Sequence, residues 1–293
     1  MKEINKCSDT KLNVFDEHRK ANAAKRIEYY KNPSIAYCKP FRIIGDLYYI
    51  GDKKVCSYLI NTGDGLIIFD SGYPHTIHLL VQCIWELGFN PSDIRYIIHT
   101  HAHFDHFGGS NEFRSLYGCK TLMSRLDTEM LRGNHSGALM DLNPMPYAGL
   151  PVIDQTFEDG EVITLGNTSI KCVLTPGHTP GNTTFFFDVR DNERIYRVGY
   201  FGGRGVMTMT RAFLDKYGFP YSLRDDFQKS IDKIRFEHVD IVITSHPSHS
   251  NMMEKRSIMM KQTEINPFID PSEWEKLMNV VLTKYQNMVD KNY

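Results

Sequence analysis

The sequence of 293 residues lacks the features that mark secreted, membrane and nucleic-acid-binding proteins. Its N-terminus, MKEINKCSDTKLNVFDEHRK, contains no apolar stretch of the roughly 7–15 residues that a secretory signal requires. No apolar run elsewhere approaches the roughly 18 residues that span a bilayer. Lysine and arginine form no long block, and the net charge is -1, so neither nucleic acid nor membrane is an expected partner. We expect a cytoplasmic protein that acts on a small molecule, of unknown oligomeric state.

Signatures of cysteine and serine catalysis are also absent. The six cysteines are scattered, form no C-x-x-C pair and do not adjoin the histidine cluster described below. In a cytoplasmic chain this predicts reduced and mostly buried thiols. No G-x-S-x-G nucleophile elbow occurs. We therefore predict neither a cysteine ligand nor a protein nucleophile.

The sequence does contain an alternation of strand and helix patterns, which indicates an α+β fold. Short β-rich runs separated by Gly-Asp turns favour antiparallel strands at the start, and amphipathic helices alternate with further strands. Two such halves would pack sheet on sheet with the helices outside. We expect strands over 42–50, 56–61, 66–70, 94–98, 120–124, 161–165, 169–174, 183–189, 194–200 and 241–244, and helices over 76–87, over 109–116, from Ser222 with Asp225 as capping partner, and from the cap residue Asp270.

The chain is expected to divide into an N-terminal extension, residues 1–37, and one main domain, residues 38–293. The extension is polar and basic, with a weakly helical stretch over 15–30, and should lie on the main domain. Residues 133–151 form an irregular segment rich in Gly, Pro and Asn. Since long loops in compact domains are often functional, we expect this segment and residues 201–218 to shape a pocket.

The strongest chemical signal is the segment His99-Thr100-His101-Ala102-His103-Phe104-Asp105-His106, in which four residues have the spacing H-x-H-x-D-H. Residues i and i+2 of an extended chain project to the same side, so His101 and His103 can reach one metal ion. Asp105 and His106 come after the strand and can turn toward a second. Zinc binds imidazole nitrogen and carboxylate oxygen. Burying imidazoles without partners is costly, so packing does not explain the cluster, and we predict a metal site.

Two further ligands are needed, because each catalytic zinc takes about three protein ligands and keeps one open position. His178 lies in the rigid turn TPGHTPG and His246 in the segment ITSHP, and each follows an apolar strand. A lone histidine is more often structural than a ligand, but strand ends are where loops gather into a site. His249 is a rival to His246 that lies further into its loop. We interpret His99 as a neighbour of the site. The remaining histidines are interpreted as surface or core residues, namely His75, His78, His135 and His238.

Three segments resemble the metallo-β-lactamase superfamily, namely GFNPSDIRYIIHTHAHFDHFGG, TPGHTPG and VDIVITSHP. The flanks PFRIIGDLYYIG, IIFDSG and NPFIDP look like the third subclass of the class B β-lactamases. The late histidine in a T-x-H-P context and the lack of a cysteine ligand point the same way. The resemblance covers roughly residues 38–290. It implies the metallo-hydrolase fold, a four-layer αββα sandwich.

The resemblance also implies a chemistry. A metal-bound hydroxide would attack the carbonyl of a β-lactam or a similar cyclic amide, and Asp105 would orient this nucleophile as well as bind metal. Asp70, at the end of IIFD, would orient a ligand imidazole; the alternative is an ordinary turn aspartate. The implied cofactors are two zinc ions, one held by His101, His103 and His178, and the other by Asp105, His106 and His246.

One departure from the family follows the strand that ends at Tyr200. Superfamily lactonases and glyoxalase II carry a metal-bridging Asp there, other β-lactamases a Cys, and the third subclass a Ser nearby. This chain has Gly202-Gly203, which argues against a lactonase or glyoxalase site and removes a group that places substrate. Arg204 would replace that group by binding a substrate carboxylate, because its planar fork matches carboxylate geometry; the alternative is a solvated loop arginine.

Two other functions share this pattern. A hydrolase of another ester, thioester or lactone would use the same metal site for a different substrate. An iron-dependent oxidoreductase, similar to the superfamily's sulfur dioxygenases or flavodiiron proteins, belongs to a different class. The complete ligand set for a second metal and the lack of a following flavodoxin-like domain disfavour the redox function. A cytoplasmic location disfavours a dedicated antibiotic-resistance enzyme, because such enzymes act where the drug meets its target.

Overall fold

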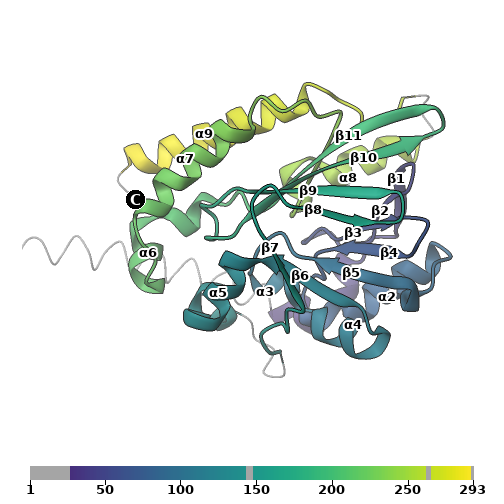
Figure 1. Cartoon of the computed structure of the whole chain (residues 1–293), viewed down its shortest axis with the longest axis horizontal. Coiled ribbons are helices and arrows are strands. Elements are labelled where there is room, and N and C mark those ends of the chain that lie inside the picture. The colour runs from purple at the N-terminus through teal and green to yellow at the C-terminus, as the bar shows by residue number, and fades with distance from the viewer. Residues whose placement is uncertain (1–26, 143–147, 262–264, 292–293) are drawn as a thin grey trace, which may run out of the picture.

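The computed structural model describes residues 27–142, 148–261 and 265–291, and in these ranges two β-sheets lie face to face (Figure 1). The strands are β1 Phe41–Ile44, β2 Leu47–Tyr49, β3 Tyr58–Asn61, β4 Leu66–Phe69, β5 Ile94–Ile98, β6 Lys120–Ser124, β7 Gln155–Phe157, β8 Val162–Leu165, β9 Thr168–Leu174, β10 Thr183–Asp191, β11 Arg194–Phe201 and β12 Ile241–Thr244. The α-helices are α2 Ile77–Glu86, α3 Phe104–Phe107, α4 Ser110–Tyr117, α5 Arg125–Gly133, α6 Arg211–Tyr217, α7 Ser222–Ile234, α8 Met252–Met259 and α9 Glu273–Asp290. The 3-10 helices are η1 Pro33–Ala36, η2 Pro74–Thr76, η3 Pro91–Asp93, η4 His135–Ala138, η5 Met140–Leu142, η6 Val206–Met209 and η7 Pro247–His249.

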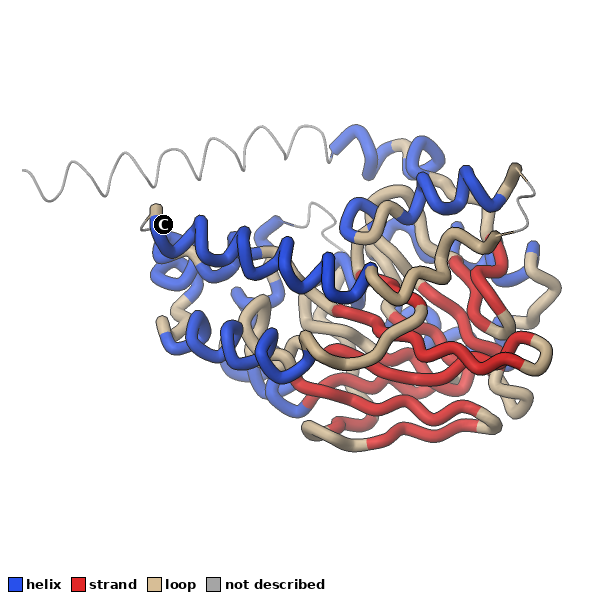
Figure 2. The backbone as a smooth tube through the Cα atoms, turned by 90° about the horizontal axis from the view of Figure 1, so that it is seen from above, coloured by secondary structure: helices blue, strands red, loops and turns tan. Residues whose placement is uncertain are grey.

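Each half of the chain forms one sheet. The first sheet has the order β1-β2-β3-β4-β5-β6-β7, antiparallel as far as β4 and parallel from β4 to β7. The second has the order β12-β11-β10-β9-β8, antiparallel except for the parallel pair β11–β12. Helices α2 and α4 cover the outer face of the first sheet, and α7 and α9 cover that of the second (Figures 1 and 2). The predicted four-layer αββα sandwich is therefore confirmed.

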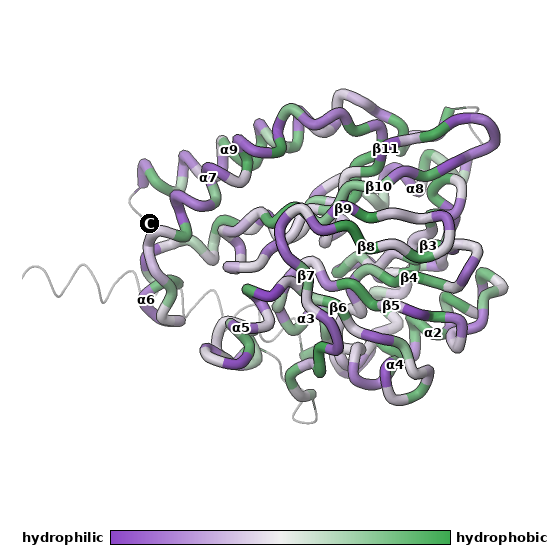
Figure 3. Tube along the Cα trace, in the orientation of Figure 1, coloured by the Kyte–Doolittle hydropathy of each residue, from purple (hydrophilic) through white to green (hydrophobic). Residues whose placement is uncertain are grey.

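The alternation of side chains along β10 shows how the layers are built. Phe185 and Phe187 are buried in the core between the two sheets, whereas Phe186 is buried on the opposite face, under α7 and α9. In the first sheet, Phe69 of β4 faces the same central core and Ile68 packs toward α2. Successive side chains of a strand point to opposite faces, so strands covered on both sides read as nearly continuous apolar runs. The strands are accordingly hydrophobic along most of their length, and the β10–β11 hairpin tip is hydrophilic (Figure 3).

The topology brings several strand ends to one edge of the sandwich. Strands β4 and β5 are parallel neighbours, so Asp70 and the histidine motif leave the first sheet side by side. In the second sheet β9, β11 and β12 run in one direction, and the segments that carry His178, Gly202 and His246 follow their carboxyl ends. The β3 hydroxyl of Tyr58 donates to the carbonyl of Thr244 over 2.8 Å and ties the two sheets together at this edge.

The first predicted strand is wrong in one respect. Residues 42–50 do not form a single strand but the antiparallel hairpin of β1 and β2. Gly45 adopts φ +48°, and a Cβ at this position would lie 2.2 Å from the carbonyl oxygen of Arg190. The chain must therefore turn at Gly45, where both the backbone angle and the close approach of β10 require glycine.

The predicted helix starts also need correction. Helix α7 begins at Ser222, but no side chain caps it, because the N–H of Leu223 already bonds to the carbonyl of Pro220 one turn earlier. The capping box with Asp225 is therefore not formed. Helix α9 begins at Glu273, two residues later than a helix capped by Asp270 would begin, although Asp270 does accept hydrogen bonds from Ser272 N–H through its side chain and from Glu273 N–H through its carbonyl.

The remaining structural expectations concern the N-terminus, the cysteines and the membrane. Most of the helix predicted over 15–30 lies outside the described residues; residues 27–31 are helical, with Tyr29 and Tyr30 buried against the body. Five of the six cysteines lie within the described ranges, all of them buried and unpaired. None of the helices in the described ranges combines the length and hydrophobicity that crossing a lipid bilayer requires.

Candidate metal centre

The histidine motif begins on the loop that joins β5 to α3, with His101 and His103, and ends within α3, which carries Asp105 and His106. His103, the residue before α3, has an extended backbone with φ -97° and ψ 147°. The rings of His101 and His103 lie 4.7 Å apart between centroids, nearly perpendicular to each other. Both side chains thus reach the same place, as expected for residues i and i+2 of an extended segment.

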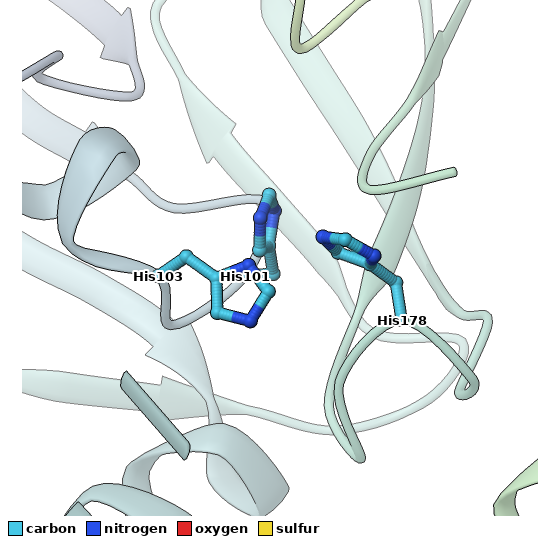
Figure 4. Close-up of side chains that lie close together, drawn as sticks. All are labelled: His101, His103 and His178. Carbon is cyan, nitrogen blue, oxygen red and sulfur yellow. The ribbon is translucent and has the colours of Figure 1, made fainter. Parts of the chain in front are cut away.

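His178 joins these two residues from the opposite sheet. Its ring lies 4.8 Å from that of His101 and 4.6 Å from that of His103, and the three rings converge (Figure 4). One nitrogen from each lies within 4.8 Å of the others. We call His101, His103 and His178 the first cluster.

A second group of three possible ligands adjoins the first. Asp105 Oδ2 lies 3.5 Å from His106 Nε2 and 3.7 Å from His246 Nε2, and one ligand atom from each lies within 4.8 Å of the others. The rings of His101 and His106 are only 4.1 Å apart between centroids, so the two groups of ligands are in direct contact. We call Asp105, His106 and His246 the second cluster.

Four of the five imidazoles in the clusters have a hydrogen-bond partner on Nδ1. His178 Nδ1 bonds to the backbone carbonyl of Gly205, and His246 Nδ1 bonds to that of Lys54, each over 2.9 Å. His101 Nδ1 lies 2.9 Å from the hydroxyl of Thr100, and His106 Nδ1 lies 2.9 Å from Asp70 Oδ2. Metal-binding histidines ordinarily use one ring nitrogen in this way, which fixes the tautomer and leaves Nε2 for the metal.

Asp70 connects the motif to both sheets. Its fully buried carboxylate accepts hydrogen bonds from the Thr100 N–H and hydroxyl, each over 2.8 Å, and from the Tyr200 hydroxyl over 2.9 Å. Together with the contact to His106, these bonds use both carboxylate oxygens. The contact with a site imidazole expected for Asp70 is thus present in the structure. Asp70 adopts φ +54° to place its carboxylate at the end of β4.

The charges in the two clusters suit a cation. Burial, reinforced by neighbouring imidazoles, lowers the pKa of His101 and His103 well below the usual range, and burial lowers the pKa of His178 to about 4. Burial would raise the pKa of Asp105, but His106 and His246 lower it to about 2. Burial also lowers the pKa of His246, whereas Asp105 and Asp70 raise the pKa of His106 against the effect of burial. Apart from His106, the site thus offers imidazoles that favour the neutral form beside an ionised carboxylate, which are the forms that bind metal.

The residues present fit a pair of metal ions. Within the described ranges, neither His101 Nε2 nor His106 Nε2 has a hydrogen-bond partner, although both atoms are buried. An unpaired buried polar atom is costly, and a bound metal would satisfy both nitrogens. These two clusters are therefore consistent with a dinuclear centre. Nitrogen and oxygen ligands suit zinc, and imidazole also suits iron and other transition metals.

The loop at Gly202-Gly203 is packed too tightly to carry a side chain. A Cβ on Gly203 would lie 1.9 Å from His178 Cδ2, and one on Gly202 would lie 2.6 Å from the carbonyl oxygen of Thr183. The loop backbone itself thus supports the face of the His178 ring. In this chain, no side-chain ligand or hydroxyl fits at these two positions.

Two cationic or potentially cationic residues flank the clusters. Arg204 is half-buried between Gly203 and Gly205, both of which pack against His178, and no ion pair to Arg204 occurs among the described residues. His249 belongs to neither cluster; its ring lies 5.2 Å from that of His246, and its buried Nδ1 has no partner within the described part of the chain. Between His246 and its rival His249, the structure therefore places His246, the predicted ligand, in the second cluster.

The other histidines whose side chains the structure describes lie outside both clusters. His99 is a buried neighbour whose Nε2 lies 3.0 Å from the hydroxyl of Ser110. His75 is buried, and exposed His238 lies 3.2 Å from Asp240.

Asp127 is a residue of the site that the sequence did not reveal. Its carboxylate accepts hydrogen bonds from Ala102 N–H, between His101 and His103, and from the hydroxyl of Thr179, next to His178. The available signal was the pattern Ser124-x-x-Asp127, which is typical of a helix N-terminus. Ser124 does cap α5 by accepting from Asp127 N–H. The pattern predicts the cap, but not the contacts with distant loops.

Comparisons with known proteins agree on one family. Residues 50–192 match the family model described as "Metallo-beta-lactamase superfamily". The structure is similar to that of BJP-1, a subclass B3 metallo-beta-lactamase of Bradyrhizobium japonicum, with a TM-score of 0.78 and 30% identity over 88% of this chain and 96% of that one.

Two curated relatives have other activities. An N-acyl homoserine lactonase of Bacillus thuringiensis is 26% identical over 164 residues, which are 48% of this chain and 61% of the lactonase. The mitochondrial persulfide dioxygenase ETHE1 of Homo sapiens is 37% identical over 105 residues, 36% of this chain and 32% of the dioxygenase. The chain thus spans less than two thirds of the length of either relative.

Proposed function

The chain belongs to the metallo-β-lactamase superfamily, and on this premise we propose that it is a binuclear zinc-dependent hydrolase that opens a β-lactam or a similar cyclic amide. One observation carries the proposal. Two clusters of three possible ligands lie next to each other. Most of their imidazoles form a hydrogen bond through Nδ1, which leaves Nε2 for a metal. Supporting the finer assignment is the likeness to a subclass B3 β-lactamase over nearly its whole length.

Each cluster would hold one zinc ion. When bound, the two ions would supply an acidified water and polarise the substrate carbonyl. Asp105 is assigned a second role, orienting the attacking water through its carboxylate. Its low pKa, held down against the effect of burial by His106 and His246, keeps it ionised at neutral pH. Asp70 and Thr100 hold the imidazoles of His106 and His101 in place.

Arg204 is assigned to substrate binding. It is half-buried and lacks an ion-pair partner in the described ranges, so burial lowers the pKa of its guanidinium and no carboxylate compensates. Buried charges are stabilised by pairing, and a carboxylate on the substrate would provide the pair. The small-molecule substrate, like the cytoplasmic location, is a prediction from the sequence.

A hydrolase of another ester, thioester or lactone is the second candidate, supported by the lactonase relative. The loop at Gly202-Gly203 disfavours a lactonase site with a metal-bridging aspartate, because no side chain fits at these two positions. An iron-dependent oxidoreductase is the third candidate, supported by the match to persulfide dioxygenase. The completeness of the second cluster favours the hydrolases.

The test is hydrolysis of a chromogenic cephalosporin by zinc-loaded protein, with His101→Ala as control and an N-acyl homoserine lactone as competing substrate. A kcat/KM above about 10⁴ M⁻¹s⁻¹ that is lost in the control would support a β-lactamase. Preferential lactone turnover would favour the second candidate. Activity with iron but not zinc would overturn the proposal.

A further inference from the structure

We propose that Asp127 is a positioning residue that joins the two loops of the first cluster, and that it thereby sets metal affinity at that cluster alone. This role rests on the proposed dinuclear centre, since it is defined by the affinity of one of its two sites. Within the described residues, the side chain forms no hydrogen bond with an imidazole or with Asp105; its partners are two backbone N–H groups and one hydroxyl.

The contacts of Asp127 reach both sides of the first cluster. One carboxylate oxygen accepts from Ala102 N–H over 2.7 Å and from the Thr179 hydroxyl over 2.8 Å. The other accepts from Gly181 N–H over 2.6 Å. Ala102 separates His101 from His103, and Thr179 follows His178. A single rigid group thus fixes the distance between the loop from the first sheet and the loop from the second.

The loop around His178 sits directly on the start of α5. Ser124 donates its hydroxyl to the carbonyl of Gly181 over 2.8 Å. A Cβ on Gly181 would lie 2.1 Å from Ser124 Oγ and 2.8 Å from Asp127 Oδ1, so only glycine permits this approach. The carboxylate lies in the first turn of α5, where the helix dipole favours a negative charge.

A carboxylate is unusual at the fully buried position of Asp127, because a buried charge is ordinarily paired with an opposite charge. Asp127 is completely buried, and no ion pair to it occurs among the described residues. Burial raises the pKa of this carboxyl to about 6, although its three donors lower it. All three partners are donors, and an acceptor-only group satisfies them all. An amide would turn an NH₂ group toward one of them, so asparagine should fit the space but not the hydrogen bonds.

Asp52 offers a matched control. It is also a buried carboxylate, and it accepts from Lys54 N–H over 2.6 Å, from Val55 N–H over 2.8 Å and from the Tyr29 hydroxyl. The loop it holds carries the Lys54 carbonyl, which accepts from His246 of the second cluster. Among the described residues, Asp52 forms no hydrogen bond with the loops of the first cluster, so Asp52→Asn perturbs a similar group without altering the contacts of those loops.

The experiment measures the zinc affinities of both sites by competition with a chromogenic chelator. His178→Ala and His246→Ala serve as references, since each leaves one cluster intact. For Asp127→Asn we expect an affinity loss of about 10- to 100-fold at the first site, the range found when supporting partners of metal ligands are removed. The second site should be unchanged. Asp52→Asn should leave the first site unchanged.

Thr179→Val and Thr179→Ser keep the inference testable if Asp127→Asn does not fold. Thr179→Val removes one of three donors and should weaken the first site less than Asp127→Asn, and Thr179→Ser should restore the affinity. Two-site binding by the wild type with unchanged first-site affinity in Asp127→Asn or Thr179→Val would overturn the role of Asp127 alone. A wild type that binds no zinc would overturn the proposed function as well.

Discussion

The candidate metal centre and the aromatic cluster around His75 both bury imidazoles, but the groups that surround these imidazoles differ. His75 is 8% exposed and is enclosed by the rings of Tyr30, Tyr29 and Tyr73, at 4.1, 4.7 and 5.4 Å between centroids. Neither of its ring nitrogens has a hydrogen-bond partner in the described part of the chain. In the metal centre, by contrast, His106 pairs Nδ1 with Asp70 and turns Nε2 toward Asp105.

This difference shows what distinguishes a ligand from a packed histidine. Burial lowers the pKa of His75 to about 4 and that of His178 likewise to about 4, so neither burial nor a low pKa identifies a metal site. The distinguishing features are a hydrogen-bond partner on Nδ1, which four of the five cluster imidazoles have, and the convergence of several ring nitrogens. His75 has neither feature and serves the packing of the N-terminal segment.

The largest expected effect on activity is the loss of one cluster ligand. His101→Ala removes an imidazole from the first cluster, and we expect hydrolysis to fall by roughly 10³-fold or more, because the metal supplies both nucleophile and carbonyl polarisation. Bound zinc per chain should fall in parallel, as measured by atomic absorption. His75→Phe is the matched control and should retain both activity and zinc. Zinc loss in His75→Phe would erase the distinction between the two regions.

A smaller effect is expected when a ligand remains but loses its support. Asp70→Asn keeps the shape of the side chain but removes the charge that holds His106. We expect a loss of about 10- to 100-fold in zinc affinity, measured by chelator competition. Tyr200→Phe removes only one donor to Asp70 and should lose less. If Asp70→Asn bound zinc as tightly as the wild type, orientation through Nδ1 would not matter here.

The sequence predicted those parts of the fold and site that depend on local pattern. The strands β5 Ile94–Ile98, β6 Lys120–Ser124 and β12 Ile241–Thr244 begin and end as expected, because buried apolar runs are bounded by polar residues. The motif H-x-H-x-D-H was recognisable because residues i and i+2 of an extended segment project to the same side.

Features that depend on distant contacts were missed. Asp127 bonds to Ala102 and Gly181, which lie 25 and 54 positions away in the sequence. The residues around Asp127 give no indication of these two contacts. The hairpin of β1 and β2 depends on Gly45 meeting the carbonyl of Arg190. The short helices α5, α6 and α8 were not predicted, because short helices take most of their stability from tertiary packing.

Arg204 should affect substrate binding rather than the chemical step. For an anionic substrate, Arg204→Ala should raise KM by about tenfold, the lower range for a lost charged hydrogen bond, while kcat changes little. A neutral lactone should show no change, which makes it the internal control. Arg204→Lys should recover part of the affinity, because it keeps the charge but not the planar fork. An unchanged KM for anionic substrates would mean that Arg204 is an ordinary loop residue.

The smallest effect on activity, and a distinct effect on stability, is expected at His75. Its pKa is about 4 in the folded protein, chiefly because of burial, against 6.5 as the reference value. The unfolded chain therefore binds a proton between pH 6.5 and 4 that the folded protein excludes, so the free energy of unfolding falls as the pH falls through this window. Relative to His75→Phe, the wild type should lose at most about 3 kcal/mol between pH 7 and pH 4, measured by urea unfolding. The clusters titrate equally in both proteins and cancel in this difference. Parallel pH profiles for the two proteins would show that His75 finds a partner for its proton, and the contrast with the metal centre would then rest on convergence alone.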